Sequence, residues 1–99
     1  QPERAGAQVL STISKRIADA LVYPDAARRR GLEGSLVASF VVDEEGNLVS
    51  SRVAVSSGSD ILDRAGLELL RGVFPVQNDA GEKLELRISI GYKLSSGVP

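Results

Sequence analysis

Apolar residues recur along this chain with two different periods, and these periods predict its secondary structure. Over residues 9–21 they return every four residues, which is the spacing of an amphipathic helix, at Val9, Ile13, Ile17 and Leu21. Over residues 84–94 they alternate with polar residues, which is the spacing of a β-strand, at Leu84, Leu86, Ile88, Ile90, Tyr92 and Leu94. Residues 1–8 are polar and small and are expected to form a flexible lead-in, and residues 95–99 a loose tail.

A short helix is predicted over residues 24–30. Pro24 suits the first turn of a helix, and Gly31 can end one in a left-handed conformation. The run Arg28–Arg30 falls in the last turn, where cations complement the helix dipole. A nucleic-acid or anion patch is the functional interpretation of this run. Because no aromatic residue interleaves with it, a solvated helix end is the simpler one.

Alternating apolar residues predict two further strands, over residues 35–43 and 47–55, joined by a tight turn. The second strand is expected to carry Val49, Val53 and Val55 on one face. The turn contains three acids, but they lack the ligand spacing of a calcium loop, so a hairpin tip is expected at Asp43, Glu44 and Glu45.

A third helix is predicted over residues 60–72, where apolar residues follow a 3.6-residue period after a stretch of serines that can cap it. Gly66 falls on its buried face and would let the helix approach the sheet closely. The acids Asp60 and Asp63 at its start are interpreted as capping residues rather than as a catalytic pair.

The order of these elements predicts one α+β domain over residues 9–94, with helices over 9–21, 24–30 and 60–72 packed mainly on one face of a three-stranded antiparallel sheet. The first two strands pair through their tight turn. The last strand returns through the helix and docks beside either the first or the second strand. In both arrangements it lies at an edge of the sheet.

An edge strand exposes unpaired backbone groups, which proteins usually protect with prolines, bulges or short strands. The segment 84–94 contains no proline, and its predicted outer face carries only Glu85, Arg87 and Lys93 as charges. Two interpretations stay open at this point. Charge and the flanking loops protect the edge, or the edge accepts an extended peptide as an added strand.

Composition narrows the classes of function. The 99 residues are 42% hydrophobic, enough for one core, and carry a net charge of −1, which disfavours a nucleic-acid partner. The chain has no cysteine and no histidine, which removes thiolate and imidazole chemistry. We therefore expect a binding domain rather than an enzyme, with no catalytic residues, no cofactor and no metal.

Several motifs, in order along residues 23–94, resemble the C-terminal domain of the TonB family. The first is the segment Tyr23–Gly34, with its Tyr-Pro pair and its Gly-x-x-Gly ending. The others are the strand 36–43, the turn 45–47, the Ser-Ser-Gly at 56–58, the helix start 61–66, Phe74-Pro75 and the closing strand that ends in Ile90–Leu94. Family members often carry a glutamine shortly before the Tyr-Pro pair, where this chain has Asp19–Val22.

The resemblance implies a periplasmic domain of an energy transducer anchored in the inner membrane of Gram-negative bacteria. The chain begins at Gln1 rather than Met and is expected to be a piece of a longer protein, whose N-terminal part would reach the ExbB/ExbD motor. The resemblance also implies that the domain binds the TonB box, a short segment of outer-membrane TonB-dependent receptors. Such binding would support the active uptake of iron chelates or vitamins.

The captured segment is expected to add to the last strand. The predicted partner-binding residues lie along that strand and beside its end, namely Arg87, Ile88, Ser89, Ile90, Gly91, Tyr92 and Lys93, with Tyr23 and Pro24. Two alternatives remain: a TolA-like or other cell-envelope scaffold on the same fold, and a homodimer that swaps the exposed strand.

Overall fold

The computed structural model describes the backbone of residues 2–94 and the side chains of residues 6–94. The loose tail predicted for residues 95–99 lies outside the described residues. Six elements follow one another along the chain: α1 (Pro2–Ala20), α2 (Asp25–Arg29), β1 (Gly34–Val42), β2 (Leu48–Val55), α3 (Asp60–Gly72) and β3 (Leu84–Tyr92). This is the predicted order of an α+β fold, with α3 at its predicted bounds and the strands within two residues of theirs.

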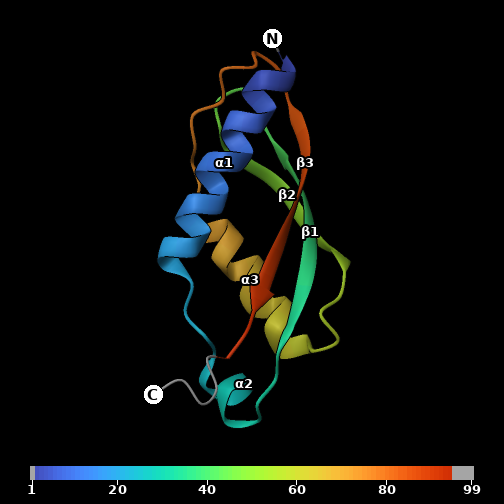
Figure 1. Ribbon diagram of the computed structural model, residues 1–99. Helices are drawn as coiled ribbons and strands as arrows, with labels where there is room; N and C mark the ends of the chain where they lie inside the picture. Colours follow the sequence, from blue (N-terminus) through green and yellow to red (C-terminus); the bar gives the residue numbers. More distant parts are fainter. Residues whose placement is uncertain (1, 95–99) are drawn as a thin grey trace.

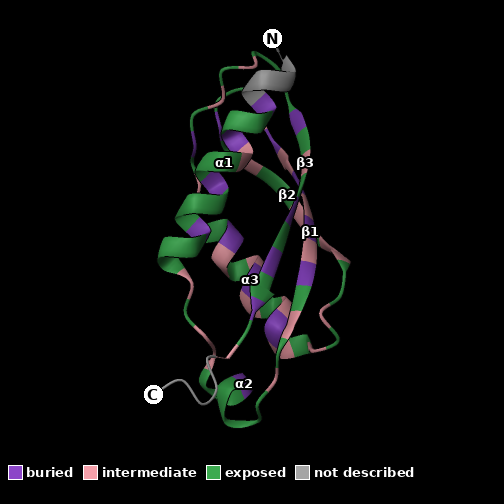
Figure 2. Ribbon diagram, viewed as in Figure 1, coloured by how far each residue is buried: buried purple, intermediate pink, exposed green. Residues whose placement is uncertain are grey.

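The two longer helices cover one face of an antiparallel sheet and leave the other face open (Figure 1). Helix α1 packs against β3, and α3 packs against β1 and β2. Figure 2 shows the buried residues along the helices and strands, and along β1 they alternate with less buried ones. The strand side chains that point away from the helices lie on this open face.

The strand order is β2-β1-β3, so the last strand lies beside the first and at an edge, as one of the two predicted arrangements requires. The central position suits β1, whose alternate residues Leu36, Ala38, Phe40 and Val42 are all buried. A strand that contributes this much apolar surface is best covered when a neighbour lies on each side.

Helix α1 is longer than predicted, because it begins at Pro2 instead of residue 9. Residues 2–8, which we expected to form a flexible lead-in, make its first two turns. Proline is favoured at the first position of a helix, and Gly6 continues the buried stripe of the helix. A Cβ atom at Gly6 would lie 3.9 Å from the Cδ2 atom of Leu86. Because glycine has no side chain, the hydrophobic pattern of the sequence does not show this contact.

The predicted face of β2 is wrong. Its pairing with β1 shifts register twice, and each shift places an extra residue in β2 while β1 stays regular. The two bulges break the alternation, so Val49 and Val55 are 52% and 56% exposed instead of sharing a buried face with Val53.

The β1–β2 turn is a structural unit, as expected of a hairpin tip. The Oδ1 atom of Asp43 accepts hydrogen bonds from the backbone N–H groups of Glu45 (2.9 Å) and Asn47 (2.8 Å). Gly46 has φ +88°, and a Cβ atom there would lie 1.6 Å from the carbonyl oxygen of Val76. The turn therefore needs glycine both for its backbone angle and for its contact with the segment after α3.

Candidate functional site

The flank of β3 that faces away from β1 is an edge of the sheet. All nine residues of β3 pair with β1, from Leu84 opposite Val42 to Tyr92 opposite Gly34. Within residues 2–94, no strand lies on the other side of β3. Helix α1 contacts β3 from the face of the sheet rather than from its edge. A row of backbone N–H and C=O groups is thus left without a strand partner.

Two hydrogen bonds show which backbone groups of β3 point outward. Asp43, which follows β1, donates its N–H to the carbonyl of Asn47 at 2.9 Å, so the backbone of Asp43 faces β2. Successive residues of a strand turn their backbone groups to opposite sides, so the even-numbered residues of the regular strand β1 face β3. Leu94, beyond β3, donates its N–H to the carboxylate of Glu33 at 2.6 Å, which fits the same alternation. The amides of the even-numbered residues of β3 therefore face β1.

The odd-numbered residues of β3 consequently turn their amides to the free edge. These residues are exposed on the open face of the sheet, with side chains at Glu85, Arg87 and Ser89 and none at Gly91. The predicted partner-binding residues Arg87 and Ser89 thus combine a free backbone with an accessible side chain. Gly91 offers a free backbone alone, and Lys93 beyond the strand is also exposed.

The other predicted residues of β3 have a different environment. The side chains of Ile88, Ile90 and Tyr92 are buried under the helices, at 9%, 1% and 2% exposure. Their amides face β1. These three residues hold β3 in the sheet, and their side chains are not available to an added strand.

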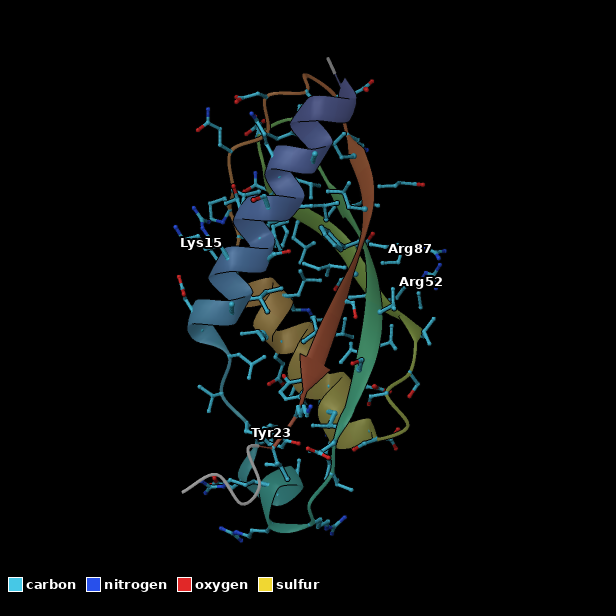
Figure 3. All side chains as sticks on the ribbon, in the orientation of Figure 1. Lys15, Tyr23, Arg52 and Arg87 are labelled. Carbon is cyan, nitrogen blue, oxygen red and sulfur yellow. The ribbon has the colours of Figure 1, made fainter. Side chains whose placement is uncertain are left out.

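Tyr23 lies beside the end of β3, and its ring contacts Tyr92. The ring centroids are 5.4 Å apart and the planes are at 83°. The hydroxyl of Tyr23 donates a hydrogen bond to the carbonyl of Leu32. Burial, followed by the nearby charge of Glu33, raises the pKa of Tyr23. Tyr23 thus fixes the segment between α1 and α2 against the C-terminal end of β3 (Figure 3).

Next to Tyr92, an apolar hollow of about 440 Å³ opens between the end of α1 and α3. Pro24 lines it, as does Val22, which is 77% exposed. Sequence patterns did not indicate this hollow, because its walls come from separate elements: Ala20, Ile61, Arg64, Ala65, Glu68 and Leu69. The one available signal was Val22, a large apolar residue outside the helical stripe.

A second hollow, of about 450 Å³, lies on the open face of the sheet and is lined by residues of all three strands. Arg52 of β2 and Arg87 of β3 both pair with Ser39 of β1, so the two arginines flank this serine in one row across the sheet. Figure 3 shows both arginines on the side away from the helices. Among the described side chains, neither arginine has a carboxylate within 4.0 Å, and the one ion pair joins Arg28 and Asp25 at 2.9 Å.

Two of the acids that the sequence offered as alternatives have structural roles. Besides Asp43 in the turn, Asp63 accepts hydrogen bonds from the hydroxyls of Ser56 (2.5 Å) and Ser57 (2.7 Å) and from the backbone N–H of Ser57 (2.8 Å). Burial acts to raise the pKa of Asp63, but these hydrogen bonds outweigh it and the pKa falls below its usual value. Asp63 therefore ties the β2–α3 loop to the first turn of α3.

The described part of the chain offers neither a metal site nor a membrane-spanning helix. Among the side chains of residues 6–94, no group of three or more acidic, histidine or cysteine residues is placed to hold a metal ion. No helix within residues 2–94 has the length and apolar character needed to cross a membrane.

Comparison with known proteins gives consistent matches. Residues 19–94 match the family described as Gram-negative bacterial TonB protein C-terminal. A curated Protein TonB of Pseudomonas putida is 57% identical over 49 residues, which are 50% of this chain and 20% of that protein. A Protein TonB of Helicobacter pylori strain J99 is 31% identical over 87 residues, which are 88% of this chain and 31% of that protein. The chain thus spans less than a third of these relatives.

The fold agrees with a solved structure. The NMR structure of a TonB C-terminal domain from Helicobacter pylori superposes with a TM-score of 0.80 at 30% identity, over 90% of this chain and 83% of that one. The family match extends from the end of α1 to the residues just after β3, and so contains the whole sheet and its free edge. On these grounds the chain belongs to the TonB C-terminal domain family.

Proposed function

We propose that the free edge of β3 captures an extended segment of an outer-membrane TonB-dependent receptor, its TonB box, by strand addition. The observation that carries this proposal is the regular nine-residue strand whose outer flank has no neighbouring strand within residues 2–94. Strand addition requires unpaired backbone groups at a uniform spacing, and the amides of Arg87, Ser89 and Gly91 supply them.

The energetics favour reversible capture. An added strand of about six residues makes roughly four to six backbone hydrogen bonds, each worth about 0.5–1.5 kcal/mol net. Ordering a flexible peptide costs about 1–2 kcal/mol per residue, so the backbone ladder is close to balanced by itself. Side-chain contacts must supply the surplus. The side chains on offer are those of the outer face of β3, and we expect a Kd of roughly micromolar order.

The family supports the wider role. Within a longer protein, this domain would be the periplasmic end of an energy transducer anchored in the inner membrane and coupled to the ExbB/ExbD motor. Capture of the receptor segment would connect that motor to the active uptake of iron chelates or vitamins.

A single-proline scan of β3 tests the strand addition. Arg87→Pro and Ser89→Pro each remove an amide that faces the free edge, so the domain should stay folded and lose peptide capture. Ile88→Pro and Ile90→Pro each remove an amide that pairs with β1, so the domain should unfold. The readout is a titration of the isotope-labelled domain with receptor N-terminal peptides, in which chemical-shift changes should concentrate in residues 84–94.

The matched control lies on the other edge of the sheet. Ser50 and Arg52 pair with the residues of β1 that face β2, so the amide of Ser51 between them faces away from the sheet. Ser51→Pro should therefore leave both the fold and peptide capture intact. A folded Ser89→Pro domain that binds the peptide like the wild type would overturn the proposal, and so would shift changes confined to β2.

A further inference from the structure

The open face of β3 has an uneven distribution of charge. From the start of the strand, the residues that face outward are the acid Glu85, the base Arg87, Ser89 with its hydroxyl, and Gly91, which has no side chain. Cross-strand neighbours on one face of a sheet lie about 4.5–5.5 Å apart, and opposite charges attract at that distance. A strand added at the free edge would place its own side chains directly beside this row.

Arg87 is the positively charged residue of this row. Its guanidinium has no carboxylate within 4.0 Å among the described side chains, although Glu85 is two residues away on the same face. Arg87 also lines the 450 Å³ hollow on the open face, which extends over β1 toward β2, so the space on the inner side of Arg87 is open as well. Arg52 continues the positive charge on the far side of Ser39.

The missing side chain at Gly91 adds a steric preference. A Cβ atom at residue 91 would lie 3.2 Å from the Oγ atom of Ser35, so glycine leaves this position of the open face free of side-chain atoms. A large side chain on the added strand can lie across the backbone there. Opposite Ser89 no such preference arises.

We infer that the added strand carries an acidic side chain opposite Arg87, a residue that is not acidic two positions away opposite Glu85, and a large side chain four positions away on the other side, opposite Gly91. This inference rests on the proposed function, and it names the chemistry of the captured peptide. The pattern also fixes register. A slip by two residues toward Glu85 places acid opposite acid, which is repulsive.

The two arginines provide a matched pair of variants. They have the same residue type, the same face and the same row, but strands are about 4.8 Å apart, so Arg87 neighbours the added strand while Arg52 is about 14 Å from it. That distance exceeds the screening length of about 8 Å at physiological ionic strength. We expect Arg87→Glu to weaken the binding of an acidic peptide about tenfold, and Arg52→Glu to weaken that binding less than twofold.

A display library of random nine-residue peptides, selected on the whole 99-residue domain, tests the inference whichever receptor the domain serves. The selected pool should share an acidic position with a large residue four positions away. Selection on Arg87→Glu should replace the acid by lysine or arginine, and selection on Arg52→Glu should leave it acidic. The order of the pattern gives the strand direction, because the acid precedes the large residue in a parallel strand and follows it in an antiparallel one.

The outcomes separate this inference from the function on which it rests. Two outcomes overturn the inference and leave strand addition standing, both with peptides that no longer bind Ser89→Pro. In the first, the selected peptides show no charge preference. In the second, their charge preference reverses on Arg52→Glu as much as on Arg87→Glu. A pool that is empty, or that binds Ser89→Pro as well as the wild type, overturns strand addition itself. Two-dimensional NMR spectra of each variant confirm that the domain is folded.

Discussion

The ring of Tyr23 meets the ring of Tyr92 edge to face, with their centroids 5.4 Å apart. One residue belongs to the connection between the first two helices, and the other is the last residue of β3. The contact therefore joins the start of the family-matched region to the end of the strand that we propose to receive a peptide. Because Tyr92 is buried, the pair is also sensitive to the ionisation of its phenols.

Alkaline pH should weaken the fold through Tyr92. Burial, and then the charge that Tyr23 acquires, raise the pKa of Tyr92 above its usual value of 10.0. The folded state thus favours the neutral phenol, and this contribution to stability is complete below about pH 10 and is lost as the pH rises through the folded pKa. Denaturant unfolding measured from about pH 8 upward should show the free energy of unfolding falling above about pH 10. Tyr92→Phe should show a smaller fall, and equal slopes for the two proteins would contradict this explanation.

Asp63 should have the opposite dependence on pH. The hydrogen bonds from Ser56 and Ser57 place its folded pKa below the usual 3.8, despite the opposing effect of burial. Its contribution is therefore present above about pH 4 and is lost as the pH falls through the folded pKa. At about pH 7, Asp63→Asn should cost about 1–2 kcal/mol of unfolding free energy and reduce the acid sensitivity. The control is Asp60→Asn, in the same turn of α3, which should change stability by less than about 0.5 kcal/mol.

Gly66 should not tolerate a side chain. A Cβ atom at this position would lie 2.7 Å from the Cδ2 atom of Leu36, which is fully buried on β1. Gly66→Ala should therefore destabilise the domain by about 1–3 kcal/mol, although alanine is the better helix former. Gly72→Ala is the matched control, because a Cβ atom there meets nothing within 4 Å, and it should stabilise the domain by up to about 1 kcal/mol. Thermal unfolding of both variants measures the difference, and two shifts of the same sign would exclude the contact with Leu36 as the cause.

Arg16 should anchor α1 to the rest of the domain. Its guanidinium donates hydrogen bonds to the carbonyls of Val73 and Pro75, each at 2.8 Å, just after α3. Arg16→Ala should cost about 1–2 kcal/mol and increase hydrogen exchange in α1. Lys15→Ala, on the neighbouring position that points away from the core (Figure 3), should have almost no effect. Unchanged exchange in Arg16→Ala would show that the apolar stripe holds α1 without this residue.

Local patterns predicted those features that depend on the chain's own periodicity. The alternation of residues 84–94 identified β3, and the tight turn after β1 restricted the last strand to an edge. The close approach at Gly66 was also predicted, because an apolar helical stripe contained a residue without a side chain. The TonB C-terminal family was predicted from motifs in the correct order.

Features that depend on contacts between distant residues were not predictable in this way. The first two turns of α1 contain Gly6, whose burial is visible only once β3 lies beside it. The bulges in β2 arise from its pairing with β1, so the exposed Val49 and Val55 were assigned to the wrong environment. The row of Arg52, Ser39 and Arg87 required the register of two strand pairs before its members could be placed together.

The two bulges of β2 also bear on how this sheet can grow. Bulges interrupt the even spacing of backbone groups along that margin, whereas β3 pairs with β1 without a register shift. Continuous cross-β polymers need a template on both sides of every subunit. A domain with a single regular template offers one place for a guest chain, so we expect complexes of one-to-one stoichiometry rather than fibres.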